Sequence, residues 1–128
     1  MSDIIHTHEA PAAIGPYVQA RRTGNMLFTS GQIAMDPKTG EIVSQDVETQ
    51  TRQCLENLAA VVQAGGCRME DVIKTTLFIK DMDDFGKINA VYGAFFGDHK
   101  PARSCVEVAR LPKDVLVEIE CIAQVPTA

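Results

Sequence analysis

PARSCVEVARLPKDVLVEIE, residues 101–120, is the stretch that decides the fold. Apolar and polar side chains alternate along residues 103–111 and again along 115–123, which is the two-residue period of a half-buried β-strand. Pro112-Lys113-Asp114 between them is typical of a turn. The sequence therefore predicts two strands that pair as a hairpin.

Pairing of these two strands would sort their side chains between the faces of a sheet. Glu118 and Glu120 point away from the apolar set of the second strand, which consists of Val115, Val117, Ile119 and Cys121. If the valines of the first strand pair with that set, Arg103 and Cys105 lie on the same face as the two glutamates. That polar face would need a second copy of the chain to cover it. This predicts an oligomer with sites at the subunit seams.

The rest of the chain predicts a mixed sheet packed on helices. The elements expected in chain order are strands at 17–22 and 26–33, a helix from Asp46 to Gly65, a strand at 72–80, a helix from Asp83 through Phe96, and strands at 103–111 and 115–123. The order is ββ-α-β-α-ββ. We therefore expect an α+β fold in which both helices pack on one face of the sheet.

Composition limits the classes of protein. The chain has 128 residues, of which 45% are hydrophobic, which is enough for a single domain, residues 1–128, with a buried core. The net charge is −5 and the longest basic cluster is Arg21-Arg22, so no nucleic-acid partner is expected. No secretory signal and no membrane span are recognisable. The four cysteines show no zinc-site spacing. Because no export signal is recognisable, we expect reduced thiols and a cytoplasmic protein.

Arg103 and Glu118 are the candidates for chemistry. A guanidinium binds a carboxylate through two parallel hydrogen bonds, although Arg103 can equally form a structural ion pair with a nearby glutamate. Glu118 is either a general base that holds a water or a solvated strand glutamate. Cys105 has no evident histidine partner, so we expect a small wall residue whose backbone amide matters more than its sulfur.

Other positions suggest close packing rather than bound groups. Gly31 lies inside an expected strand, which indicates close approach of a ligand or another backbone. His6 and His8 lack a third ligand, so no metal site is predicted. The apolar stripe along 85–96 follows helical spacing and is interpreted as core. No nucleotide-binding or pyridoxal-phosphate motif is present, and we expect catalysis without a cofactor.

Longer stretches carry a resemblance over nearly the whole chain. They are APAAIGPYVQA (10–20), LFTSGQIAMDPKTGEI (27–42), TRQCLENLAAVVQAGG (51–66), VIKTTLFIKDMDDFGKIN (72–89) and PARSCVEVARLPKDVLVEIE (101–120). With these segments the chain resembles the reactive intermediate/imine deaminase (Rid) family, and most closely its RidA subgroup. The resemblance implies a fold like chorismate mutase of the trimeric type. Such homotrimers form an inner barrel from their sheets and have three clefts at the seams.

The resemblance also implies roles for individual residues. The arginine matching Arg103 grips the substrate carboxylate, with help from the backbone at Cys105. The glutamate matching Glu118 positions or activates water, and Tyr17 hydrogen-bonds the departing nitrogen or the water. The remaining cleft positions are those matching Ser30, Gly31 and Asn89.

The implied reaction is hydrolysis of 2-iminobutanoate and 2-iminopropanoate to 2-oxo acids and ammonia. These imines are released by pyridoxal-phosphate-dependent threonine and serine dehydratases, which are the expected functional partners. One alternative is a non-catalytic trimer that senses 2-oxo or imino acids through Arg103. RNA cleavage or translation inhibition is disfavoured by the acidic charge. The segment 97–100 is shorter than in close relatives, which leaves the preferred side chain open.

Overall fold

The computed structural model describes residues 2–127 of the chain. Its helices are α1 (Val47–Ala64) and α2 (Phe85–Phe96). Its strands are β1 (Asp3–Ile5), β2 (Ala20–Thr23), β3 (Met26–Thr29), β4 (Val72–Ile79), β5 (Ala102–Glu107) and β6 (Val117–Gln124). Three 3-10 turns lie at Met69–Asp71, Met82–Asp84 and Pro112–Asp114. The predicted order of elements is confirmed from β2 onward, and β1 is an addition to it.

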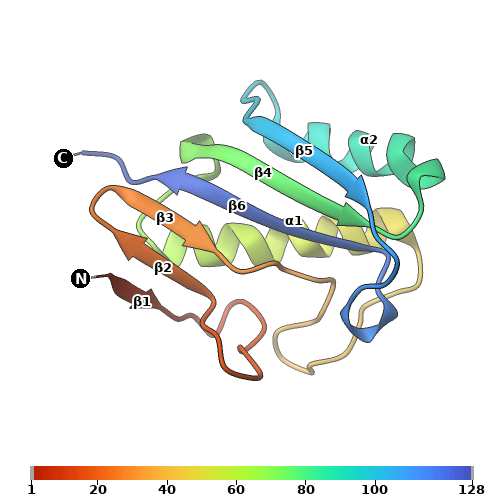
Figure 1. Cartoon of the computed structure of the whole chain (residues 1–128), viewed down its shortest axis with the longest axis horizontal. Coiled ribbons are helices and arrows are strands. Elements are labelled where there is room, and N and C mark those ends of the chain that lie inside the picture. The colour runs from red at the N-terminus through yellow and green to blue at the C-terminus, as the bar shows by residue number, and fades with distance from the viewer. Residues whose placement is uncertain (1, 128) are drawn as a thin grey trace.

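The strands form one mixed sheet in the order β1-β2-β3-β6-β4-β5. β4 and β5 run parallel, and all other neighbours are antiparallel. Both helices lie on the same side of this sheet (Figure 1). The predicted α+β architecture, with two helices on one face of a mixed sheet, is therefore confirmed.

The predicted hairpin between the last two strands is wrong. β4 lies between β5 and β6 and pairs with both of them. The chain enters β5 from α2, and a strand–helix–strand connection of this kind returns parallel to the first strand rather than antiparallel. β5 also ends at Glu107, which leaves residues 108–111 outside the strand.

The strand pairing corrects the faces as well. Thr75 of β4 pairs with Arg103 on one side and with Cys121 on the other, so these three side chains share the helix face. Phe78 pairs in the same way with Glu118, which therefore points to the opposite face. Cys105 follows Arg103 by two residues in β5, so its side chain points to the same face, the helix face. Arg103 and Glu118 do not share a face, contrary to the prediction.

Local signals explain the limits of α1. The carboxylate of Asp46 caps the helix by accepting a hydrogen bond from the backbone N–H of Thr49 at 2.9 Å. The helix ends at Gly65, where an added Cβ would lie only 2.7 Å from the Leu27 side chain. Gly66 then adopts a φ of +89°, which favours glycine. The chain thus turns from α1 toward β4.

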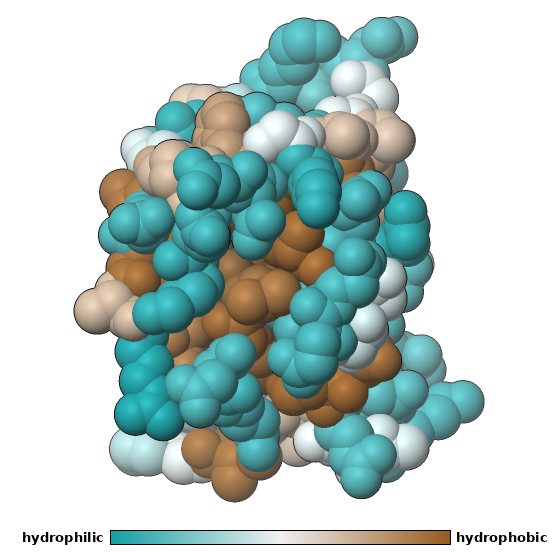
Figure 2. All heavy atoms as spheres, turned by 90° about the vertical axis from the view of Figure 1, so that its right-hand side faces the viewer, coloured by the Kyte–Doolittle hydropathy of each residue, from teal (hydrophilic) through white to brown (hydrophobic). Residues whose placement is uncertain are grey.

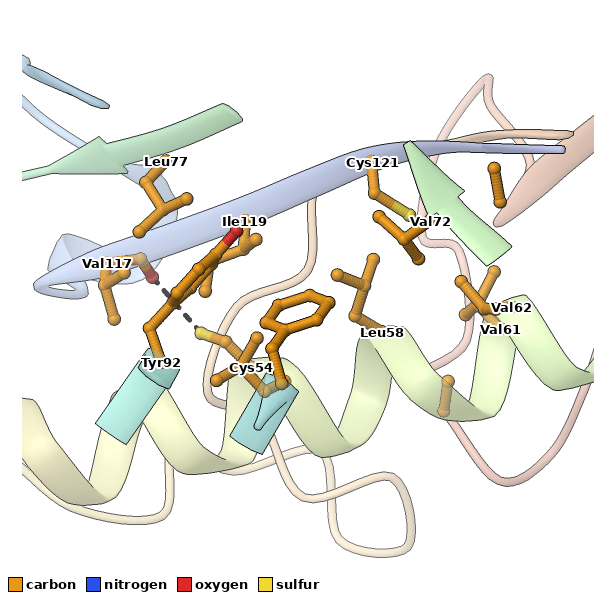
Figure 3. Close-up of a cluster of buried hydrophobic side chains, with 14 of the residues drawn as sticks. Cys54, Leu58, Val61, Val62, Val72, Leu77, Tyr92, Val117, Ile119 and Cys121 are labelled. Carbon is orange, nitrogen blue, oxygen red and sulfur yellow. Dashed lines mark hydrogen bonds between the residues drawn. The ribbon is translucent and has the colours of Figure 1, made fainter. Parts of the chain in front are cut away.

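The core fills the space between the helices and the sheet. Figure 3 shows its centre, where Leu58 of α1 points toward β6 and where Leu77 of β4 lies beside Ile119 of β6. All three of these side chains are fully buried. The thiol of Cys54 donates a hydrogen bond to the Val117 carbonyl oxygen at 3.5 Å. All four cysteines are free thiols.

The opposite face of the sheet has no helix over it (Figure 1). Phe28 and Val106 each expose 44% of their surface, and both belong to this face by register. Exposed apolar side chains on an uncovered sheet face are typical of contacts between proteins.

Figure 2 views a different surface, the end of the molecule at which β4 and β5 finish. Hydrophobic atoms gather in the middle of this end and hydrophilic atoms surround them.

No helix within residues 2–127 combines the length and the apolar character that crossing a membrane would require.

Candidate functional site

Arg103 lies at the open edge of the sheet and is held there by α2. Its Nη1 donates a hydrogen bond to Asn89 Oδ1 at 2.7 Å. The guanidinium carbon lies 4.9 Å from the centre of the Tyr92 ring and 5.4 Å from the centre of the Phe85 ring. Positions 85, 89 and 92 are spaced by four and three residues, so they share one helical face. That face orients the guanidinium.

The position of Tyr92 is fixed in turn by β4. The hydroxyl groups of Tyr92 and Thr75 are 2.7 Å apart, and Thr75 is fully buried. Burial raises the pKa of Tyr92, which keeps its hydroxyl neutral and able to donate. β4, α2 and β5 thereby support the guanidinium together, because Thr75 is also the strand partner of Arg103.

Arg103 has no carboxylate partner within residues 2–127. The ion pairs of this part of the chain involve Arg68 and Arg110 only. Glu107, the carboxylate closest to it in β5, instead accepts a hydrogen bond from the Met82 backbone N–H at 2.8 Å. The structural ion pair considered for Arg103 is therefore not formed among the described residues, and these residues leave its charge available for an anion.

The thiol of Cys105 is not set up as a nucleophile. Burial raises its pKa, and the nearby Arg103 opposes that shift only in part. A thiol with a raised pKa stays protonated at neutral pH and reacts slowly. Cys105 is thus a half-buried residue that shares a sheet face with the guanidinium, and its role in the site stays a prediction.

Glu118 and Gly31 form a second cluster on the other face of the sheet. A Cβ added at Gly31 would lie 2.7 Å from the carboxyl carbon of Glu118 and would overlap its oxygens. The glycine is therefore needed for the approach of a carboxylate side chain rather than of a backbone. Burial raises the pKa of Glu118, and the negative charge of Glu120 raises it further.

Tyr17 and Ser30 border this second cluster. Ser30 donates its hydroxyl to the Val18 carbonyl oxygen at 2.6 Å, which ties the end of β3 to the segment that carries Tyr17. Tyr17 is 53% exposed, and together with Gly31 it lines a cavity of about 260 Å³. The buried side chain of Gln19 braces the same segment by donating to the Pro11 carbonyl oxygen at 2.8 Å.

One chain therefore holds the predicted site residues as two separate halves. The first half, Arg103 with Asn89 and Cys105, lies on the helix side at the β5 edge. The second half consists of Glu118 and Gly31, with Tyr17 and Ser30 at its border.

Sequence reasoning missed Tyr92 and Phe85 as neighbours of Arg103. Their helical spacing predicts that both belong to the core, and Tyr92 is indeed buried. The polar Asn89 within the same apolar stripe was the available signal that this helix face meets something charged.

Comparison with known proteins settles the family. A family model described as Endoribonuclease L-PSP matches residues 7–125. The chain belongs to this family. A solved Yersinia pestis structure of the Rid protein family is 45% identical, with a TM-score of 0.95, and covers 98% of this chain and 100% of that one. The resemblance to the Rid family is thus confirmed.

Two curated relatives and two more structures show how far the similarity extends. Proteins named 2-iminobutanoate/2-iminopropanoate deaminase from Salmonella typhimurium and Escherichia coli are 60% and 59% identical over 126 residues, which is 96% of this chain and 98% of theirs. The structure of Escherichia coli TdcF with bound serine is 56% identical, with a TM-score of 0.92, over 95% of this chain and 98% of that one. The structure of a Thermotoga maritima protein described as a putative endoribonuclease is 51% identical, with a TM-score of 0.96, over 99% of this chain and 100% of that one. These matches confirm the predicted fold.

Proposed function

We propose that this protein is an enzyme that hydrolyses 2-iminobutanoate and 2-iminopropanoate to the corresponding 2-oxo acids and ammonia. The observation that carries the proposal is the guanidinium of Arg103, which is held by Asn89 and two aromatic rings but has no carboxylate partner within residues 2–127. The activity named for the relatives that are about 60% identical supports the same conclusion.

We infer that the active form is a homotrimer whose sites lie between subunits. Within one chain the sheet separates the Arg103 half from the Glu118 half, because the two side chains point to opposite faces. A neighbouring copy that brings its helix-free sheet face to the β5 edge would unite them. The exposed Phe28 and Val106 on that face favour such a contact. A ring of three copies closes when each edge meets the next face.

Binding begins with the carboxylate of the substrate. The fork of Arg103 forms two charge-assisted hydrogen bonds to the carboxylate oxygens. Asn89 and the Tyr92 ring keep the fork in one orientation, so little conformational entropy is lost when the substrate binds. The serine bound to the related TdcF also carries a carboxylate, which supports this assignment.

Hydrolysis then needs a positioned water and a base. The carbon of a protonated imine is already electrophilic, so orientation and proton transfer supply most of the acceleration. Glu118 takes a proton from the attacking water, whose oxygen bonds to the imine carbon. The proton on Glu118 is then passed to the nitrogen of the tetrahedral adduct. The C–N bond breaks and ammonia leaves as the hydroxyl group of the adduct gives its proton back to the Glu118 carboxylate and becomes the C=O group of the 2-oxo acid. Tyr17 hydrogen-bonds the departing nitrogen. General-base catalysis by a group such as Glu118 accelerates a reaction by about 10²- to 10⁴-fold.

The environment of Glu118 suits this role. Burial raises its pKa toward neutrality, and a base is most effective when its pKa lies near the working pH. Pyridoxal-phosphate-dependent threonine and serine dehydratases release such imines, so we place the enzyme downstream of them. The net charge of −5 leaves RNA cleavage as the weaker alternative.

The test couples a threonine dehydratase to this protein. Threonine and semicarbazide are mixed with the dehydratase, so that semicarbazide traps the released imine. The protein should lower the trapped imine and raise 2-oxobutanoate at catalytic concentrations. A protein that binds 2-oxobutanoate without accelerating its formation would instead be the non-catalytic sensor. Arg68→Ala is the matched control, because Arg68 is an exposed arginine that pairs with Glu70 and Asp71 and belongs to neither half.

A further inference from the structure

Helix α1 carries three hydrogen-bonding side chains on the face that packs on the sheet. They are Gln50, Cys54 and Asn57, and we call them the polar stripe. Their spacing of four and three residues places them on one side of the helix. Gln50 and Cys54 are fully buried, and Asn57 is 1% exposed. A buried amide costs free energy unless its hydrogen bonds are made, so the partners of the polar stripe decide what it does.

The first two members of the polar stripe hold the main chain just before Glu118. Oε1 of Gln50 accepts a hydrogen bond from the Leu116 backbone N–H at 2.8 Å. The thiol of Cys54 donates to the Val117 carbonyl oxygen at 3.5 Å (Figure 3). Burial raises the pKa of Cys54, and the negative charge of Glu118 raises it further, so the thiol keeps the proton that it donates. The two residues that precede Glu118 are therefore tied to α1.

The third member, Asn57, holds the segment that carries Gly31. Its Nδ2 donates to the carbonyl oxygens of Ile33 at 3.0 Å and of Met35 at 2.9 Å. Its Oδ1 accepts a hydrogen bond from Gln53 Nε2 at 2.9 Å, which keeps the amide in this orientation. The two carbonyl groups follow Gly31 at a point where β3 has already ended. Asn57 thus anchors this segment beyond the end of its strand.

The two anchored segments meet at a single bridge. The Gln32 backbone N–H donates to the Ile119 carbonyl oxygen at 2.8 Å, and the Ile119 N–H donates to the Gln32 carbonyl oxygen at 3.0 Å. These two residues directly follow Gly31 and Glu118. Within residues 2–127, every buried side-chain nitrogen and oxygen has a hydrogen-bond partner. A fully satisfied buried network of this kind favours one geometry over its near alternatives.

The polar stripe acts on Glu118 from the other side of the sheet. Val117 and Ile119 are buried against the helices, so Glu118 between them points away from α1. A Cβ added at Gly31 would lie 2.7 Å from the Glu118 carboxyl carbon, so a small shift of either segment changes the surroundings of the carboxylate. We propose that the polar stripe is a positioning device that holds the Glu118 carboxylate against Gly31 and so aims it at the attacking water. The inference rests on the proposed function, in which Glu118 is the base.

Two variants remove the hydrogen bonds at either end of the polar stripe. Asn57→Leu keeps the branching of the side chain and deletes both donors, and leucine is a good helix former. Gln50→Met keeps the length of the side chain and deletes the bond from Leu116. Leu58→Ala is the matched control, because Leu58 is a fully buried residue of α1 whose apolar side chain takes part in none of these hydrogen bonds.

The first readout is the kinetics of hydrolysis of 2-iminobutanoate released by threonine dehydratase. Asn57→Leu and Gln50→Met should each lower kcat by about tenfold or more, because a displacement of about 1 Å of a catalytic group can cost about 100-fold. KM should stay within about threefold, because Arg103 still binds the substrate carboxylate. Leu58→Ala, compared at a temperature at which all variants are folded, should retain kcat within about threefold.

The second readout is the pH profile of kcat. Burial raises the pKa of Glu118, and the negative charge of Glu120 raises it further. Loosening the Gly31 segment admits water to the carboxylate, which lowers this pKa toward the ordinary carboxyl value. The decrease of kcat at low pH should therefore move to lower pH in Asn57→Leu. It should stay in place in Leu58→Ala, although that variant is also less stable.

The third readout combines two substitutions. If Asn57 acts only through Glu118, adding Asn57→Leu to Glu118→Gln should lower the residual kcat by no more than about twofold. An independent effect of Asn57 on the fold or on substrate binding would instead repeat the tenfold loss seen in the single variant. The residual rate of Glu118→Gln is measured at raised enzyme concentration.

The outcomes separate the two proposals. If Asn57→Leu and Gln50→Met retain the kcat and the pH profile of Leu58→Ala, the polar stripe is structural only and the positioning role is wrong. The same conclusion follows if Asn57→Leu lowers kcat equally in the presence and in the absence of Glu118. In both cases the proposed function stands. If the wild type hydrolyses no imine, the proposed function itself is wrong, and the role of the polar stripe is refuted with it.

Discussion

Replacing Arg103 with lysine isolates the contribution of the guanidinium fork. Lysine keeps the positive charge but offers a single ammonium in place of two parallel donors. It cannot reproduce the fork, whose Nη1 donates to Asn89 Oδ1 at 2.7 Å and whose central carbon lies 4.9 Å from the centre of the Tyr92 ring. If Arg103 only supplied charge, Arg103→Lys would be a mild change. If the fork reads the carboxylate, the change is severe.

The structure sets the expected magnitude. Losing one charge-assisted hydrogen bond to the substrate costs about 1.5–3 kcal/mol. Losing the stacking that orients the group costs about 0.5–1 kcal/mol more. The sum of about 2–4 kcal/mol corresponds to a decrease of about 30- to 1000-fold in kcat/KM.

The assay measures kcat/KM for 2-iminobutanoate released by threonine dehydratase in the presence of semicarbazide. Thermal unfolding should remain within a few degrees of wild type, because Arg103 forms no ion pair within residues 2–127. Arg68→Lys serves as the control for an exposed arginine. An Arg103→Lys variant that retains kcat/KM within about threefold would refute the reasoning that a planar fork binds the substrate.

Three further predictions concern the second half of the site and the core. Gly31→Ala places a Cβ against the Glu118 carboxylate and should lower kcat by up to about 100-fold, whereas Gly86→Ala should not; equal activities would show that Glu118 does not need its present position. Burial raises the pKa of Glu118, and the base must be unprotonated to act, so kcat should fall as the pH is lowered through a pKa above the ordinary carboxyl value. Glu118→Gln should abolish this decrease at low pH, and an unchanged pH profile in the variant would assign the base to another residue. Leu58→Ala removes a fully buried side chain and should lower the free energy of unfolding by about 2–5 kcal/mol in urea titration, while a loss below about 1 kcal/mol would contradict the packing seen around Leu58.

Local patterns in the sequence predicted single elements well. The Asp46 cap, the helical spacing after it and the Gly65-Gly66 stop locate α1 within a residue or two, because each signal acts within one turn of helix. The β-branched run at 72–80 likewise becomes β4 (Val72–Ile79). These signals depend only on neighbouring residues, so they can be read without knowledge of the fold.

Strand neighbours could not be predicted in the same way. Alternation shows that Arg103 and Cys105 share a side of β5, but it does not show which strand lies next to them. β4 comes between β5 and β6 and pairs Arg103 with Thr75 but Glu118 with Phe78. Thr75 and Phe78 are an odd number of residues apart, so the predicted common face of Arg103 and Glu118 is wrong. The same limit hid the contact between Tyr92 and Arg103, which depends on α2 packing over the sheet edge.

Subunit mixing tests the central claim that a site joins Arg103 of one copy to Glu118 of another. Arg103→Ala and Glu118→Gln homotrimers should each be nearly inactive. After the two variants are unfolded and refolded together in equal amounts, about a quarter of the seams should pair an intact Arg103 with an intact Glu118, so about a quarter of wild-type activity should return.

Refolding either variant with the Arg103→Ala/Glu118→Gln double variant provides the control. In such mixtures every seam lacks at least one of the two groups, so no activity should return. If the equal mixture of the single variants also stays inactive, although mixed trimers are present by native mass spectrometry, the two residues do not act across a subunit seam and the account is contradicted.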